Sequence, residues 1–195
     1  MKKADVDDRL FHRSTNADRA ALVVRDQRIS FGRRVPSSLK NIKEPVLLED
    51  CVDYVGTEVL DVDLIIQGVF SGTVHTTGSI TVAGHAEGNF YCSSFKVEKT
   101  GEAHGNVYHA KGAQTSYGEI LGNFYGLIRL SKVSVKSGGI INGSVEAEAL
   151  VCSDYGSEVK NGHHKIGTFA KITNGGFISG EIQIDSAILS LFEGE

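Results

Sequence analysis

Residues 95–107 read Phe-Lys-Val-Glu-Lys-Thr-Gly-Glu-Ala-His-Gly-Asn-Val, and the same thirteen-position pattern recurs at residues 133–145 and 170–182. Each copy places apolar residues at its first, third, ninth and last positions and glycine at its seventh and eleventh. A unit this short cannot bury its own apolar face, so copies must stack on one another. The pattern therefore predicts a solenoid.

The step Gly-x-apolar marks the register of successive coils. It occurs at Gly72/Val74, Gly88/Phe90, Gly105/Val107, Gly122/Phe124, Gly143/Val145 and Gly180/Ile182. The glycines are separated by 16, 17, 17, 21 and 37 residues, and the last interval is about two coils long. Between the glycines, apolar and polar residues alternate with the period of a strand that buries one face.

This alternation predicts an all-β fold, a parallel β-helix (β-solenoid) of about six to seven coils. The crossover rule favours a right-handed path. The apolar residues that follow the glycines are predicted to form one core stack, which consists of Val74, Phe90, Val107, Phe124 and Val145.

Glycine and proline divide the chain. Residues 1–55 contain both prolines and one glycine, whereas the other 22 glycines follow. The first part is also rich in charge, which is typical of a flexible segment. We therefore expect an N-terminal tail or cap at residues 1–55, largely flexible, the β-helix at residues 56–185, and a C-terminal tail at residues 186–195.

Two stretches depart from the repeat. Gly112-Ala113-Gln114 stands where other coils have an apolar pair, which predicts thinner packing there. Residues 160–167, which include His163 and His164, interrupt the pattern and are interpreted as a protruding loop.

The sequence contains no clear catalytic or cofactor motif. His75, His104 and His109 are expected to face solvent, and the adjacent His163 and His164 lack an evident third metal ligand. Asp61 and Asp63 share an outward strand face, where paired carboxylates more often face solvent or protect a sheet edge than act as acid and base. The cysteines lack a third orienting group in the sequence. We therefore predict that the protein is not an enzyme and has no catalytic residues, cofactor or metal site.

The composition predicts the cellular compartment of the protein and bears on whether it binds a membrane or nucleic acid. Three widely spaced cysteines, no CxxC motif and no signal peptide predict a cytoplasmic protein with reduced thiols. No apolar run approaches 18 residues, so no membrane-spanning helix is expected. The basic residues at positions 9–43 are interleaved with acidic ones, which argues against a nucleic-acid partner.

Residues 64–182 resemble the bactofilins, a bacterial cytoskeletal family. The resemblance is carried by Ile66-Gln-Gly68-Val-Phe-Ser-Gly72, by the Gly-Asn-Val and Gly-Asn-Phe steps, and by Ile172-Thr-Asn-Gly-Gly-Phe-Ile-Ser-Gly180. It implies a right-handed β-helix that polymerises end to end without nucleotide. It also implies filaments at the inner face of the cytoplasmic membrane that scaffold partners in cell shape or cell-wall synthesis.

On this resemblance, the polymer interface is expected at Phe177, Ile178 and Ile182, and a membrane contact at Leu10 and Phe11. The apolar C-terminal tail could instead fold over the open end. Two other functions remain open. One is a hexapeptide-type acyltransferase or a carbonic anhydrase-like trimer, although the 16- and 17-residue spacings do not fit its strict period of six. The other is a solenoid adaptor that does not polymerise.

Overall fold

The computed structural model describes residues 11–13, 22–24, 29–30, 45–48, 53–60, 62–136 and 138–184, and every regular element within them is a β-strand. The first ten strands are β1 (Phe11–Arg13), β2 (Leu22–Val24), β3 (Ile29–Ser30), β4 (Val46–Leu48), β5 (Asp53–Leu60), β6 (Leu64–Ile66), β7 (Val69–Thr76), β8 (Ser79–Val82), β9 (His85–Cys92) and β10 (Ser94–Val97). The others are β11 (Glu102–His109), β12 (Tyr117–Ile120), β13 (Asn123–Arg129), β14 (Lys132–Val135), β15 (Ile140–Ser153), β16 (Glu158–Lys160), β17 (His163–Thr173), β18 (Phe177–Ile178) and β19 (Glu181–Ile184).

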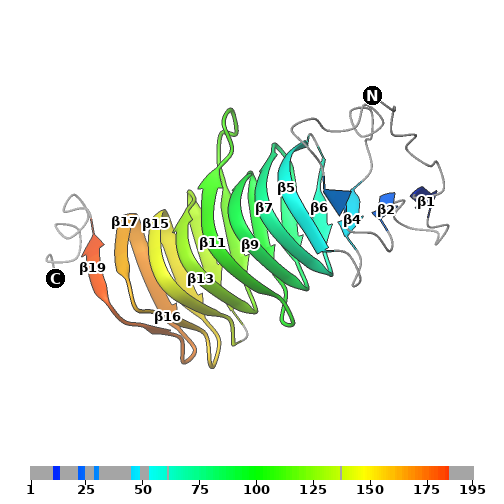
Figure 1. Cartoon of the computed structure of the whole chain (residues 1–195). Coiled ribbons are helices and arrows are strands. Elements are labelled where there is room, and N and C mark those ends of the chain that lie inside the picture. The colour runs from blue at the N-terminus through cyan, green and yellow to red at the C-terminus, as the bar shows by residue number, and fades with distance from the viewer. Residues whose placement is uncertain are drawn as a thin grey trace, which may run out of the picture.

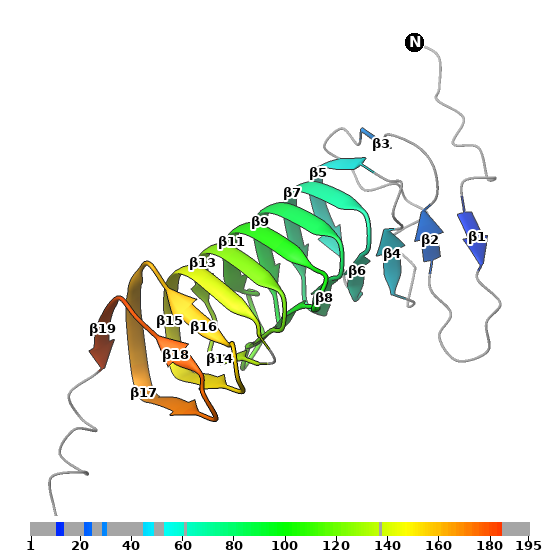
Figure 2. The ribbon, with the colours of Figure 1, turned by 90° about the horizontal axis from the view of Figure 1, so that it is seen from below.

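These strands wind into a solenoid of about seven turns. Each strand from β5 to β17 pairs in parallel with a strand of the next coil, as β7 pairs with β9 and β9 with β11. The coils lie one behind another along a rod, with β19 at one end and β1, β2 and β4 at the other (Figures 1 and 2). The predicted all-β parallel solenoid is confirmed.

Alternating side chains point into the rod and build four apolar columns. The first column contains Val74, Phe90, Val107, Ile128, Val145, His164 and Ile182. The second contains Ile66, Val82, Val97, Ile120, Val135, Cys152 and Ile172. The third contains Phe70, Ala86, Ala103, Phe124, Ile141, Val159 and Ile178. The fourth contains Leu64, Ile80, Phe95, Gly118, Val133, Leu150 and Ala170.

The packing within a column balances large and small residues. Phe124 lies directly above Ala103 in the third column. Between columns, the Phe95 ring of the fourth column meets the Phe124 ring edge-on at 6.0 Å between centroids. Each fully buried Val, Ile or Phe contributes about 1.5–3 kcal/mol relative to an exposed one. The columns therefore hold the coils together, and the backbone ladders set their spacing.

The predicted core stack needs one correction. All five of its residues are buried, but Phe124 is not in the column of Val107. Val107 pairs with Ile128, and the glycine in register is Gly126 rather than Gly122. The reason is that the extra residues of this coil lie before β12. The glycine and the apolar residue in register with Gly105 and Val107 therefore stand four positions later than the repeat pattern predicts.

A ladder of glycines runs beside the first column. It consists of Gly56, Gly72, Gly88, Gly105, Gly126 and Gly143, each opposite the next. At Gly126 φ is +134°, and a β-carbon there would overlap the carbonyl oxygen of Gly105. Any other residue at this position would have to adopt an unfavourable backbone conformation, and its β-carbon would push the two coils apart. These positions therefore require glycine because neighbouring backbones approach closely.

The two irregular stretches differ from expectation. Residues 111–115 leave the coil between β11 and β12 and project from the rod as an inserted loop (Figure 1), and Gly118 of the same coil occupies the fourth column between Phe95 and Val133 without a side chain. Residues 160–167 do not protrude as a loop. Lys160 ends β16 and His163 begins β17, and the His164 side chain occupies the first column. The alternation of β17 continues through the two histidines, which explains why one of them is inside.

Parallel pairing extends upstream of the predicted start of the rod. β5 begins at Asp53 and pairs along its length with β7, and β2 and β4 continue the ladder from β6. β1 and β2 pair antiparallel. The domain limits at residues 55 and 185 stay predictions, since much of the N-terminal segment and all of residues 186–195 lie outside the described residues.

Candidate functional site

Considering the described residues alone, the interior columns end without a covering layer at the C-terminal end of the rod. The last coil is formed by the second half of β17 with β18 and β19, and each of these segments pairs with the preceding coil. Within the described ranges, no strand pairs with their other side. The four columns end here, at Ala170, Ile172, Ile178 and Ile182.

Exposure changes abruptly within single columns at this end. Ile172 is 51% exposed, whereas Cys152 directly below it is 0% exposed. Both side chains have the same inward position, and the difference arises because no strand among residues 11–184 that the structure describes forms a further layer over Ile172. The end is therefore an apolar face backed by a row of backbone N–H and C=O groups. Such an edge is able to accept another strand.

The predicted interface residues lie at this end with two different orientations. Ile178 and Ile182 are the terminal members of interior columns. Phe177 is 55% exposed and pairs with Glu158, so it belongs to the outward face of the coil. Phe169, 45% exposed on β17, adds a further aromatic ring that the sequence analysis did not single out. Its signal was weak because it stands one position outside the thirteen-position pattern.

His164 lies in the layer just below the open face. It is 1% exposed, its Nε2 donates to the carbonyl oxygen of Ser179 at 3.0 Å, and its Nδ1 has no partner among the described residues. His163 points outward and pairs with Glu181 at 2.8 Å. The two adjacent histidines thus diverge and do not share a ligand position.

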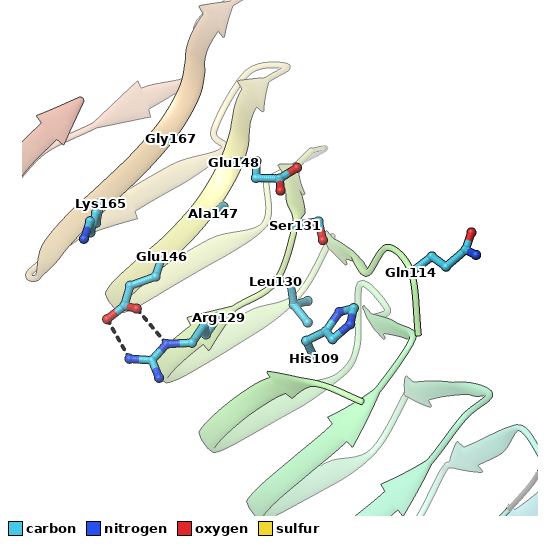
Figure 3. Close-up of a pocket in the computed structure, with 10 residues that line it drawn as sticks. All are labelled: His109, Gln114, Arg129, Leu130, Ser131, Glu146, Ala147, Glu148, Lys165 and Gly167. Atoms are coloured by element: carbon cyan, nitrogen blue, oxygen red, sulfur yellow. Dashed lines mark hydrogen bonds and ion pairs between the residues drawn. The ribbon is translucent and has the colours of Figure 1, made fainter. Parts of the chain in front are cut away.

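A groove on the flank is the second concave feature (Figure 3). It has a volume of about 460 Å³ and lies between the projecting loop and the edges of β13, β15 and β17. It is lined by His109, Gln114, Arg129, Leu130, Ser131, Glu146, Ala147, Glu148, Lys165 and Gly167. The sequence analysis missed it because the lining comes from four successive coils, and only the register brings these residues together.

Electrostatics in the groove are dominated by one ion pair. The Arg129 guanidinium donates twice to the Glu146 carboxylate, at 2.6 and 3.0 Å (Figure 3). This hydrogen bonding raises the pKa of Arg129 and lowers the pKa of Glu146. Arg129 also lies 5.9 Å from the centre of the Tyr108 ring. The pair is a charged, partly exposed feature of the flank.

Groups with catalytic potential in the groove are engaged with the chain itself. His109 donates from Nε2 to the carbonyl oxygen of Ala113 at 2.6 Å, and the hydroxyls of Ser131 and Ser116 lie 3.3 Å apart. Among the lining residues no hydroxyl and imidazole are hydrogen-bonded to each other, as a nucleophile and its base would be. Cys92 is 0% exposed, and burial raises the pKa of its thiol to about 12, so it is not a nucleophile at neutral pH.

Two other predicted sites are placed only in part. Asp63 is exposed and accepts a hydrogen bond from the Ser79 backbone at 2.6 Å, whereas Asp61 lies outside the described residues. Leu10 lies outside them as well, and Phe11 is described only as backbone in β1. Across the described part of the chain, no helix combines the length and apolar content needed to cross a bilayer.

Comparison with known proteins gives one positive result. A family model described as "Bactofilin: Polymer-forming cytoskeletal" matches residues 64–164, just over half of the chain. The matched segment begins at β6 and ends in β17, so it covers the central coils of the solenoid. Neither the curated proteins nor the solved structures contain a match.

Proposed function

Since this chain belongs to the bactofilin family of polymer-forming cytoskeletal proteins, we propose that it assembles end to end into a filament through the open face of its last coil. The observation that carries this proposal is the set of inward column residues left uncovered there, above all Ile172 at 51% and Ile182 at 43% exposure. A second copy stacked on this face would continue both the apolar columns and the backbone ladders.

The energetics support assembly without an external energy source. Burying one Ile or Phe side chain is worth about 1.5–3 kcal/mol, and each 1.4 kcal/mol is about a tenfold change in affinity. Several such side chains at one junction therefore provide a strong contact even after the cost of association. The glycine-rich steps serve the ladder between coils and are not followed by the Lys-Ser/Thr of a phosphate loop. The proposed filament consequently grows without nucleotide.

The cellular role is inferred from the family and the tail. We place the filament in the cytoplasm, where it contacts the inner face of the cytoplasmic membrane through the segment with Leu10 and Phe11. A single apolar pair gives only marginal membrane affinity per chain, but a filament presents many such pairs at once and so binds with higher avidity. The flanks of the rod remain free to hold partners that act in cell shape or cell-wall synthesis.

The enzyme alternative is less well supported. The family is structural and polymer-forming. Coil lengths along the glycine ladder are 16 residues between Gly72 and Gly88 and 17 between Gly88 and Gly105, which do not fit a hexapeptide period. A solenoid adaptor that does not polymerise would need a polar cap at its end.

Electron microscopy of the purified full-length chain, in buffer without nucleotide, tests the proposed function. We expect long unbranched filaments, and their subunit repeat should match the length of one rod or a multiple of it. Discrete trimers would support the enzyme alternative, and discrete monomers would support the adaptor.

A further inference from the structure

Three side chains on the outer face of the central coils combine the donor types of a metal site. His85 starts β9 and Glu102 starts β11, and the two are direct partners in the parallel register. His104 lies two residues beyond Glu102 on the same strand, so its side chain emerges on the same face. The fold therefore gathers two imidazoles and one carboxylate from adjacent coils.

Their polar atoms already lie close together. Oε1 of Glu102 is 2.7 Å from Nε2 of His104 and 3.5 Å from Nδ1 of His85. All three potential ligand atoms lie within 4.8 Å of one another. The side chains are about 40% exposed, which gives them freedom to move and leaves their outer side open to solvent.

We propose that His85, Glu102 and His104 bind one divalent transition-metal ion of the zinc type. Two imidazole nitrogens and a carboxylate oxygen are ligands that zinc accepts at about 2.0–2.2 Å, with a fourth position left for water or another ligand. The carboxylate oxygen of Glu102 already lies within 3.5 Å of both imidazole nitrogens. Small rotations of the three half-exposed side chains would therefore place their ligand atoms around one ion. The donor set excludes Ca²⁺ and Mg²⁺ as preferred ions, since these favour oxygen ligands.

Neighbouring residues prepare the cluster. The Tyr125 ring stacks on His104 with 4.5 Å between centroids and an angle of 18°, which limits rotation of the imidazole. Glu87 is the register partner of His104 and is exposed, so it brings a second carboxylate to the same face. Orientation by outer partners is what distinguishes a prepared metal site from scattered ligands.

Other exposed histidines lack this arrangement. His75 stacks on Tyr91 at 4.3 Å. His163 pairs with Glu181, and no third ligand atom converges on them in the part of the chain that the structure describes. Within the described residues, the cluster at β9 and β11 is the one group of three such side chains whose ligand atoms converge. It also lies on the flank, away from the last coil, so occupancy of the site is separable from assembly.

Calorimetric titration of Zn²⁺ into chelator-treated full-length protein tests the proposal. We expect one ion per chain in the wild type. His85→Ala, Glu102→Gln and His104→Ala should each weaken binding by at least about tenfold, because losing even an outer partner of a ligand costs about 10–100-fold. His75→Ala is the matched control, an exposed histidine on the next coil, and should bind as the wild type does.

Co²⁺ provides an independent readout, because a low-coordinate nitrogen and oxygen site gives visible absorption that Zn²⁺ abolishes by displacement. Circular dichroism and electron microscopy should show that all four variants still fold and assemble. The proposal is overturned if the wild type takes up no ion in a saturable manner. It is equally overturned if the three cluster variants bind Zn²⁺ as tightly as His75→Ala does.

Discussion

His164 and Ile182 are direct partners in the register of β17 and β19, yet His164 is 1% exposed and Ile182 is 43% exposed. One layer of the first column separates a closed interior from an open one. Among the described side chains, Nδ1 of His164 is also the buried nitrogen without a hydrogen-bond partner. The apolar stack is therefore least regular just below the face that we assign to assembly.

Replacing Ile178 by arginine should abolish long filaments while the chain stays folded. The charge would have to be buried at each junction, and the apolar contact worth about 1.5–3 kcal/mol would be lost. Light scattering should detect monomers or short oligomers, and circular dichroism should retain the strand signal. Tyr155→Arg is the matched control, since Tyr155 is 90% exposed on a turn. Long filaments of Ile178→Arg would show that this end is not the contact.

Replacing Val107 by aspartate should prevent stable folding. Val107 is 0% exposed in the first column, and an unpaired carboxylate there costs several kcal/mol. Tyr108→Asp changes the adjacent residue, whose half-buried ring faces outward and stacks on Tyr91 with 5.0 Å between centroids, and should lower the melting temperature much less. Equal melting temperatures for the two variants, measured by circular dichroism, would contradict the inward assignment.

Replacing Gly126 by alanine should lower the melting temperature far more than replacing Gly112. Both glycines have positive φ, +134° and +93°, so both variants pay for an unfavourable backbone conformation of about 1–2 kcal/mol. At Gly112 an added β-carbon meets nothing within 4 Å, whereas at Gly126 it meets the backbone of Gly105. The difference between the two thermal melts isolates the close approach of coils, and similar melts would refute it.

The thiol of Cys92 should resist a thiol reagent in the folded protein and react after denaturation. Burial raises its pKa from 9.0 to about 12. The unfolded chain releases this proton near pH 9 and the folded chain does not, so the free energy of unfolding should fall as pH rises from about 9 toward 12. Denaturant titrations across this window measure the slope, and Cys92→Ala should reduce it. Rapid labelling of Cys92 at neutral pH in the native state would contradict this account.

The contribution of the Arg129–Glu146 pair should disappear in acid. The hydrogen bond from Arg129 lowers the pKa of Glu146 below 4.5, so its stabilising effect is present above that value and is lost as pH falls through the lower folded-state pKa. Glu146→Gln should therefore melt below the wild type at pH 7, and the two should converge as the pH falls below 4.5 through the lowered pKa of Glu146. The effect is small because the pair is at the surface and screened by salt. A pH-independent difference would mean that packing, rather than charge, is responsible.

Much of the architecture could be predicted because it depends on local pattern. The period-two alternation and the repeated glycines indicate short strands and coils of 16–17 residues, and such units are stable only when stacked. The same reasoning placed Val74, Phe90, Val107 and Val145 in one column. The apolar character of the last coil was likewise visible, although its use as an interface stays a proposal.

The sequence by itself thus determined a stack of parallel coils with an apolar interior, because alternation and glycine spacing are properties of neighbouring residues. Only the tertiary structure decided the register. Because the inserted loop at residues 111–115 precedes β12, Ile128 rather than Phe124 occupies the first column. The sequence of a coil does not show at which end an inserted segment lies. Register also placed His164 inside the rod and brought His85 beside Glu102. Contacts between coils depend on which residues stand opposite each other, and that is settled when the strands pair.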